Sequence, residues 1–65
     1  MNIRQFINEY GQHIESYKEY DNGVIFFRFA ESDKIMWLKG VICEEMGMKV
    51  KTGEPGRYYF FEPVN

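Results

Sequence analysis

The sequence predicts an α+β protein, a two-layer sandwich in which a four-stranded antiparallel sheet carries two helices on one face. Two observations lead to this fold class. Two segments show the apolar spacing of a helix, and each is followed by a pair of short runs that flank a glycine-containing turn. The element order is therefore αββαββ. With 65 residues, the chain corresponds to one small domain, residues 1–65.

The first element is a helix over residues 2–10. Asn2 is expected to cap its start, and Gln5 completes a capping-box pattern three residues later. Gly11 is expected to be its C-cap, because a glycine in the middle of a longer helix would be costly. The apolar side chains recur at positions i, i+3, i+4 and i+7, namely Ile3, Phe6, Ile7 and Tyr10.

A hairpin follows, with strands at about 13–20 and 24–30. Asn22-Gly23 lies between them, and this pair is the strongest short-range hairpin signal because both central positions of a type I′ turn need a positive φ. The sequence therefore predicts a two-residue turn at this point.

The second helix is expected over residues 32–46, with Ser32 as its N-cap and Gly47 as the C′ glycine that ends it. This segment is apolar around much of its circumference, and it includes Met36 and Trp37. Packing against both the sheet and the first helix accounts for this composition. An apolar stripe that receives a partner is the alternative.

A second hairpin joins strands at 48–52 and 57–64, and Pro55-Gly56 suits a type II turn. The two halves of the chain, about 2–30 and 32–64, can be aligned so that Gly11 matches Gly47 and Phe27 matches Phe60. Both a duplicated αββ unit and two unrelated helix–hairpin units remain open. The alignment places Tyr58 and Phe60 towards the helices.

Alternation along the strands leaves a second set of side chains for the open face of the sheet. Lysines alternate with Met48 and Val50 in one strand, and a continuous apolar set in strand 24–30 is expected to face the helices. The candidate binding residues on the open face are Phe26, Arg28, Lys49, Lys51, Arg57, Tyr59 and Phe61, joined by Glu15 and Tyr17.

This mixture of aromatic and cationic side chains has three interpretations. The face can be simply exposed to solvent, since cross-strand aromatic pairs stabilise a sheet and Lys and Arg keep it soluble. It can be a protein interface, where Tyr, Phe and Arg are enriched. It can also be a platform on which single-stranded nucleic acid stacks. The net charge of −2 argues against a dedicated nucleic-acid binder.

The sequence contains no catalytic, cofactor or metal signature. Cys43 is the only cysteine and His13 the only histidine, so neither a disulfide nor a tetrahedral zinc site is expected, and nothing pairs these two residues as nucleophile and base. No apolar run is long enough for a signal peptide or a membrane span, which favours the cytoplasm.

We therefore expect a small non-catalytic binding protein that acts by protein–protein contact, either as a homodimer or as an inhibitor or adaptor of a larger protein. A nucleic-acid-binding regulator is the alternative. No cofactor is expected. Acidic chains of this size are also common among phage and mobile-element products. This association is weaker than the arguments from individual residues.

Overall fold

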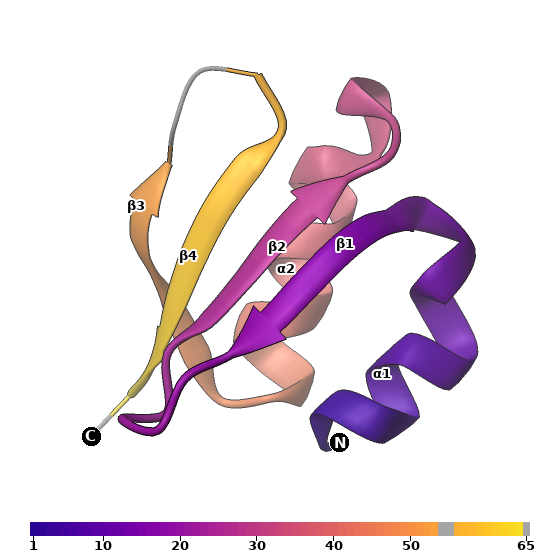
Figure 1. Ribbon diagram of the computed structural model, residues 1–65. Coiled ribbons are helices and arrows are strands. Elements are labelled where there is room, and N and C mark those ends of the chain that lie inside the picture. Colours follow the sequence, from indigo (N-terminus) through magenta and orange to yellow (C-terminus); the bar gives the residue numbers. More distant parts are fainter. Residues whose placement is uncertain (54–55, 65) are drawn as a thin grey trace.

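The computed structural model describes residues 1–53 and 56–64, and its elements follow the order αββαββ (Figure 1). A 3-10 turn, Gly11–His13, lies before β1, and another, Ser32–Lys34, lies before α2. The helices and strands are α1 (Ile3–Tyr10), β1 (Ile14–Glu19), β2 (Ile25–Phe29), α2 (Ile35–Glu45), β3 (Met48–Gly53) and β4 (Tyr58–Pro63).

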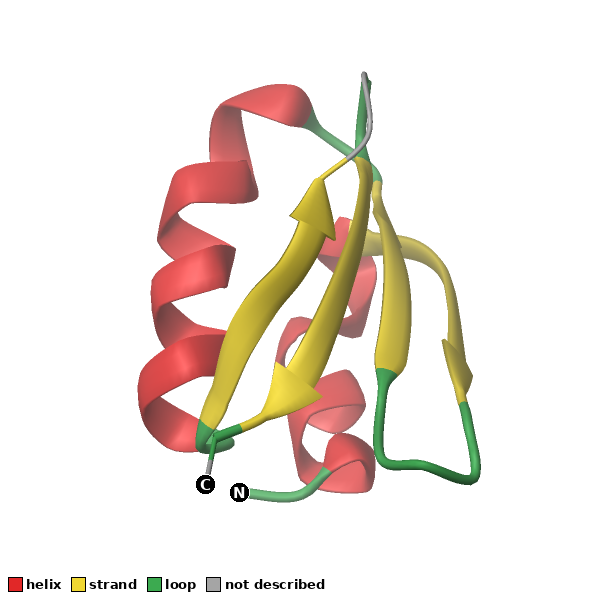
Figure 2. Ribbon diagram, turned by 90° about the vertical axis from the view of Figure 1, so that its left-hand side faces the viewer, coloured by secondary structure: helices red, strands yellow, loops and turns green. Residues whose placement is uncertain are grey.

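The four strands form one antiparallel sheet in the order β1-β2-β4-β3. Both helices lie on the same side of this sheet and leave its other face open (Figure 2). The predicted fold class is confirmed. The pairing of β2 with β4 joins the two hairpins at the centre of the sheet, so β1 and β3 are the edge strands.

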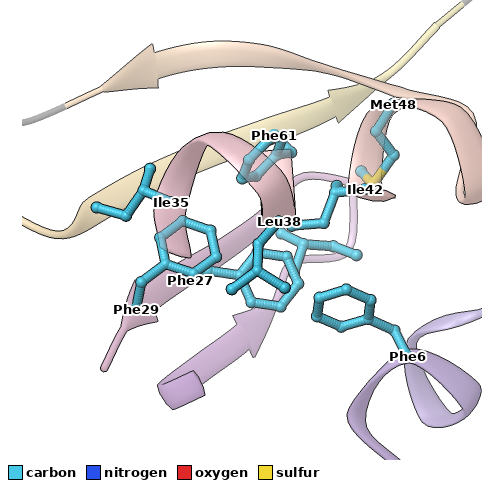
Figure 3. Close-up of a cluster of buried hydrophobic side chains, with 9 residues drawn as sticks. Phe6, Phe27, Phe29, Ile35, Leu38, Ile42, Met48 and Phe61 are labelled. Carbon is cyan, nitrogen blue, oxygen red and sulfur yellow. The ribbon is translucent and has the colours of Figure 1, made fainter. Parts of the chain in front are cut away.

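The core lies between the sheet and the helices, and large aromatic side chains fill much of it (Figure 3). Phe6 reaches in from α1 and meets Phe27 at a ring-centroid distance of 5.4 Å, edge to face. Such aromatic pairs add stabilisation beyond the area they bury, which helps a chain this short to form an adequate core. The buried cluster consists of Phe6, Ile25, Phe27, Phe29, Ile35, Leu38, Ile42, Met48 and Phe61.

The predicted ends of α1 are confirmed. The backbone N–H of Gln5 donates to Asn2 Oδ1 at 2.9 Å, and the backbone N–H of Asn2 donates to Gln5 Oε1 at 2.9 Å, which completes the capping box. Gly11 is the C-cap, and its N–H donates to the carbonyl of Ile7.

The first hairpin forms as predicted, but its turn is not the two-residue type I′ turn. Among the described residues only glycines have positive φ, so Asn22 does not adopt the left-handed conformation that type I′ requires. Instead, the N–H of Gly23 donates to Tyr20 O, and the N–H of Tyr20 donates to Val24 O. The loop thus has three residues and ends on Gly23 at a φ of 90°.

The start of α2 also differs from the prediction. Ser32 does not cap the helix, because it already lies inside the 3-10 turn Ser32–Lys34, and no side-chain hydrogen bond caps either that turn or α2. The end of α2 agrees with the prediction, because Met46 is the C-cap and Gly47 follows at a φ of 64°. The predicted Pro55-Gly56 turn falls partly on residues 54–55, outside the described residues.

The largest correction concerns β4. Phe61 is 0% exposed and Tyr59 packs against the core, so these two residues lie on the helix-facing side, not on the open face. Phe26 is opposite Phe60 and Arg28 is opposite Tyr58, which places Tyr58 and Phe60 on the open face. A shift of one residue exchanges the two faces of a strand, and the alignment of the two halves introduced that shift.

Both edge strands contain a β-bulge. The pairing of β1 with β2 shifts between Ile14 and Ser16, and that of β3 with β4 shifts between Val50 and Thr52. After the first bulge Tyr17 is opposite Phe27, so it lies on the helix-facing side and the prediction for it is wrong. Bulges and exposed lysines both disfavour pairing of an edge with another strand.

Candidate binding surface on the open sheet face

The open face carries a continuous row of four aromatic rings, which we call the aromatic row. It consists of Tyr58, Phe26, Phe60 and Tyr20. Phe26 is stacked with Tyr58 at a centroid distance of 5.7 Å and lies 5.0 Å from Phe60. Phe60 continues to Tyr20, 6.5 Å away in the loop after β1. Three segments of the chain thus build the row, and only the pairing of β2 with β4 brings them together.

A cation lies over each end of the aromatic row. The guanidinium carbon of Arg28 is 4.9 Å from the centroid of Tyr58, and Lys18 Nζ is 5.2 Å from the centroid of Tyr20. Cation–π attraction at partly exposed sites contributes about 0.5–1 kcal/mol. These contacts favour the observed positions of the two end rings.

One carboxylate organises the arginines at the Tyr58 end. Glu15, in the bulge of β1, lies 3.3 Å from Arg28 Nη1 and 3.7 Å from Arg57 Nη2. Arg57 also donates from Nε to the carbonyl of Phe29 at 2.8 Å, which anchors its side chain at the end of β2. Arg28 Nε is buried and has no hydrogen-bond partner among the described residues. The two guanidinium groups therefore share one acid.

Five of the seven predicted binding residues remain candidates for this surface. Phe26 is a member of the aromatic row and Arg28 covers one end of it. Lys49 lies opposite Glu62 in the register of β3 and β4, and Lys51 lies in the bulge of β3, exposed. Arg57 precedes β4 and joins the arginine pair.

The other two predicted residues support the opposite side of β4. Phe61 packs against Phe27 with centroids 5.8 Å apart, edge to face. Tyr59 lies over Gly53, where an added Cβ would come within 2.8 Å of Tyr59 Cε2, and Lys39 Nζ lies 5.3 Å from the Tyr59 ring. Neither ring contributes to the open face.

Sequence reasoning missed Tyr58, Phe60, Tyr20 and Lys18. A signal for the first two was present, because Glu62 has the same parity as Tyr58 and Phe60 and lies within the strand. The alignment of the two halves led to the opposite assignment and placed Arg57 on the open face with Tyr59 and Phe61. However, β4 begins only at Tyr58, so strand alternation does not extend to Arg57. Tyr20 lies in a loop, where alternation gives no information.

Both residues considered for catalysis have structural neighbours. Cys43 is half-buried and packs against the core. His13 Nδ1 lies 2.9 Å from Glu31 Oε1, and its ring is edge to face with Trp37 at 5.5 Å. Within the part of the chain that the structure describes, no group of three or more His, Cys, Asp or Glu residues is arranged to hold a metal ion. No helix in that part is long and apolar enough to cross a membrane.

The fold and this surface define a two-layer α+β protein with an open, aromatic sheet face. Comparison of the chain with models of known protein families, with curated proteins and with solved structures finds no match.

Proposed function

We propose that the protein is a small, non-catalytic binding protein that acts by contact between its open sheet face and another protein. The aromatic row, with Arg28 and Lys18 over its ends, is the observation that carries this proposal. Tyr and Arg are enriched in interface hot spots, and rigid aromatic side chains lose little conformational entropy on binding. The reducing cytoplasm is its proposed setting, since the one cysteine, Cys43, has no internal partner for a disulfide.

The edges of the sheet support contact through the face in preference to strand addition. Each edge strand is interrupted by a bulge, and β3 also presents Lys49 and Lys51. Addition of a partner strand needs a regular, accessible row of backbone groups, and these features interrupt it. The open face has no such obstacle. An inhibitor or adaptor of a larger protein and a homodimer are both forms of this proposal.

A nucleic-acid-binding regulator is the second candidate, and the same combination of rings and cations favours it. Bases stack on exposed aromatic side chains, while Lys and Arg contact the phosphates. Two observations weigh against it. Glu15 already pairs with both arginines, and the chain carries a net charge of −2.

The proposal is tested by affinity capture from the native host with the wild-type chain and two variants. Phe60→Thr removes the central ring of the row while keeping a residue suited to a strand. Glu19→Thr is the control, because it introduces the same residue at an exposed position of β1. Glu19 is opposite Ile25 and therefore lies on the helix-facing side of the sheet. A protein that is recovered with wild type and the control but lost with Phe60→Thr, and that then binds the purified chain, is the expected result.

Two further measurements separate the alternatives. Sedimentation velocity at two protein concentrations detects a homodimer, which Phe60→Thr should dissociate. Anisotropy of a labelled oligothymidylate or oligouridylate at low and moderate salt tests the second candidate, because phosphate contacts weaken as salt rises. The second candidate would replace the proposal if three results hold together. The wild-type chain binds either oligonucleotide and Phe60→Thr does not, no protein partner is captured, and no dimer is detected.

A further inference from the structure

The helix α2 has apolar side chains on two of its sides, and one of these sides is buried while the other is only partly covered. Ile35, Leu38 and Ile42 are buried against the sheet. On another side Met36 is 84% exposed and Trp37 is 49% exposed, so packing against α1 accounts for only part of the apolar composition of this helix. A helix that is apolar around most of its circumference is normally buried all round. The exposed side of α2 is therefore available to a partner.

A cleft lies between α1 and α2, and two perpendicular rings form part of its wall. Tyr10 of α1 and Trp37 of α2 meet edge to face, with centroids 5.5 Å apart and an interplanar angle of 79°. Val41, one turn after Trp37, is half-buried and extends the apolar lining. The volume is about 530 Å³, within the range of ligand-binding clefts. Both helices lie on one side of the sheet (Figure 2). The aromatic row lies on the other side, because Phe26 and Phe60 alternate with the buried Phe27 and Phe61.

Gly40 lies in this cleft and has no evident role within the chain. It is in the middle of α2, where glycine is less favourable than alanine. Apart from the two adjacent residues and the nearby backbone of the same helix, a Cβ added at this position would meet no heavy atom within 4 Å, and the φ of Gly40 is not in the left-handed region. Neither packing nor backbone conformation therefore requires glycine there. Absence of a side chain does allow another chain to approach the helix backbone closely.

The charged side chains of the cleft have one sign, and the N-terminal ammonium of Met1, which also lines the cleft, donates to the backbone carbonyl of Glu45 at 3.1 Å. These charged side chains are Glu9, Glu44 and Glu45, all exposed, and no Lys or Arg of the described residues lines the cleft. Carboxylates next to aromatic faces attract ammonium and guanidinium groups, through ion pairing and through cation–π contact. The chemistry of the lining selects a cation with an apolar stem.

We propose that the cleft between α1 and α2 binds a cationic, amphipathic segment of a partner protein. The alkyl stem of a Lys or Arg side chain packs against Trp37 and Tyr10, its head group meets the glutamates, and the partner backbone passes over Gly40. This surface is separate from the open sheet face and does not depend on the function proposed for that face. The cleft thus provides a second contact surface, whose side chains are acidic, whereas those at the ends of the aromatic row are cationic.

The test uses a fluorescein-labelled 14-residue peptide made of Leu and Lys in helical amphipathic spacing, with a Leu/Glu peptide of the same pattern as its counterpart. Anisotropy gives the affinity for each. Trp37 is the only tryptophan, so a blue shift of its emission reports burial of this site and no other. We expect saturable binding of the Leu/Lys peptide in the micromolar range with a blue shift, and no binding of the Leu/Glu peptide.

Variants then locate the site. Glu44→Lys should weaken binding by about tenfold, while Asp21→Lys, the same charge change in the loop after β1, should alter it less than about twofold. Gly40→Ala should raise the thermal midpoint of unfolding yet weaken binding by roughly fivefold, which a purely structural glycine would not do. Phe60→Thr should leave binding of the Leu/Lys peptide unchanged. Failure of this proposal can therefore be distinguished from failure of the function proposed for the open face.

Three results would overturn the proposal. These are no saturable binding, equal affinity for both peptides, and equal losses in Glu44→Lys and Asp21→Lys. Sedimentation velocity adds the remaining outcome. A dimer that Trp37→Ala dissociates, without peptide binding, would mean that a second copy of this chain covers α2 instead.

Discussion

Replacing either of two neighbouring phenylalanines by alanine tests the register of β4. Phe61 is 0% exposed and packs against Phe27, whereas Phe60 lies on the open face next to Phe26 and Tyr20. Because the two residues are adjacent and chemically identical, their intrinsic strand propensities cancel in the comparison. A difference in stability therefore reports only which face each ring occupies.

The expected difference is large compared with the total stability. Phe→Ala in a tightly packed core costs about 3–5 kcal/mol, because it loses the transfer free energy of the ring and leaves a cavity. For Phe60, which is only half-buried, the loss is about 1–2 kcal/mol, from cross-strand contacts and partial burial. A domain of this length has a free energy of unfolding of roughly 3–10 kcal/mol, so Phe61→Ala removes a large part of it.

Urea denaturation followed by Trp37 fluorescence and by far-UV circular dichroism provides the measurement. The midpoint for Phe60→Ala should fall modestly, and that for Phe61→Ala should fall much further. If Phe61→Ala does not fold, Phe61→Leu, which retains much of the apolar volume, is compared with Phe60→Leu in its place.

The opposite order would refute the register. If Phe60→Ala, or Phe60→Leu, destabilises the protein as much as or more than the matching change at Phe61, then Phe60 faces the helices, as the alignment of the two halves predicted. The aromatic row on the open face would then lose its central ring.

Three other changes have defined expected effects. Asn2→Ala removes the side chain that caps α1 and should lower the free energy of unfolding by about 1 kcal/mol, measured by thermal denaturation, whereas Asn8→Ala on the same helix should not. Gly47→Ala forces a side chain into a φ of 64° and should cost about 1–2 kcal/mol in the same assay; an unchanged midpoint would contradict the C′ assignment. Glu15→Gln removes the carboxylate shared by Arg28 and Arg57 and should cost less than about 1 kcal/mol at low salt, with the loss reduced in 1 M NaCl; a loss independent of salt would mean that these pairs are not the cause.

Local signals predicted the elements well because they act over a few residues. The Asn2–Gln5 capping box, the Gly47 terminator and the 3.6-residue apolar spacing each depend on contacts within one or two helical turns. Even the errors at Asn22 and Ser32 left the hairpin and the helix in place. They changed only the turn geometry and the conformation of one helix start, where several local arrangements have similar free energies.

The candidate surface was harder to predict because it depends on register. The run from Tyr58 to Phe61 is apolar at every position, so it contains no alternation from which to read a face. The charged residues on either side of the run, Arg57 and Glu62, differ in parity and so give no consistent assignment. The register of β2 with β4 decides it by pairing Phe26 with Phe60. Tyr17 was also assigned to the wrong face, because the bulge in β1 adds one residue and reverses the alternation that follows it. Tyr17 therefore lies on the helix-facing side.

The sequence by itself determined the fold class, the element order and the inward set of β2, since periodicity and capping are properties of short segments. Only the tertiary structure decided which rings of β4 are exposed, that Tyr20 extends their row, and that the second side of α2 remains uncovered beside an acidic cleft. The reason is physical. Strand pairing and helix packing bring together residues that are far apart in the chain, such as Phe26 with Phe60 and Tyr10 with Trp37. A shift of one residue in register, which local composition does not reveal, decides which side chains meet.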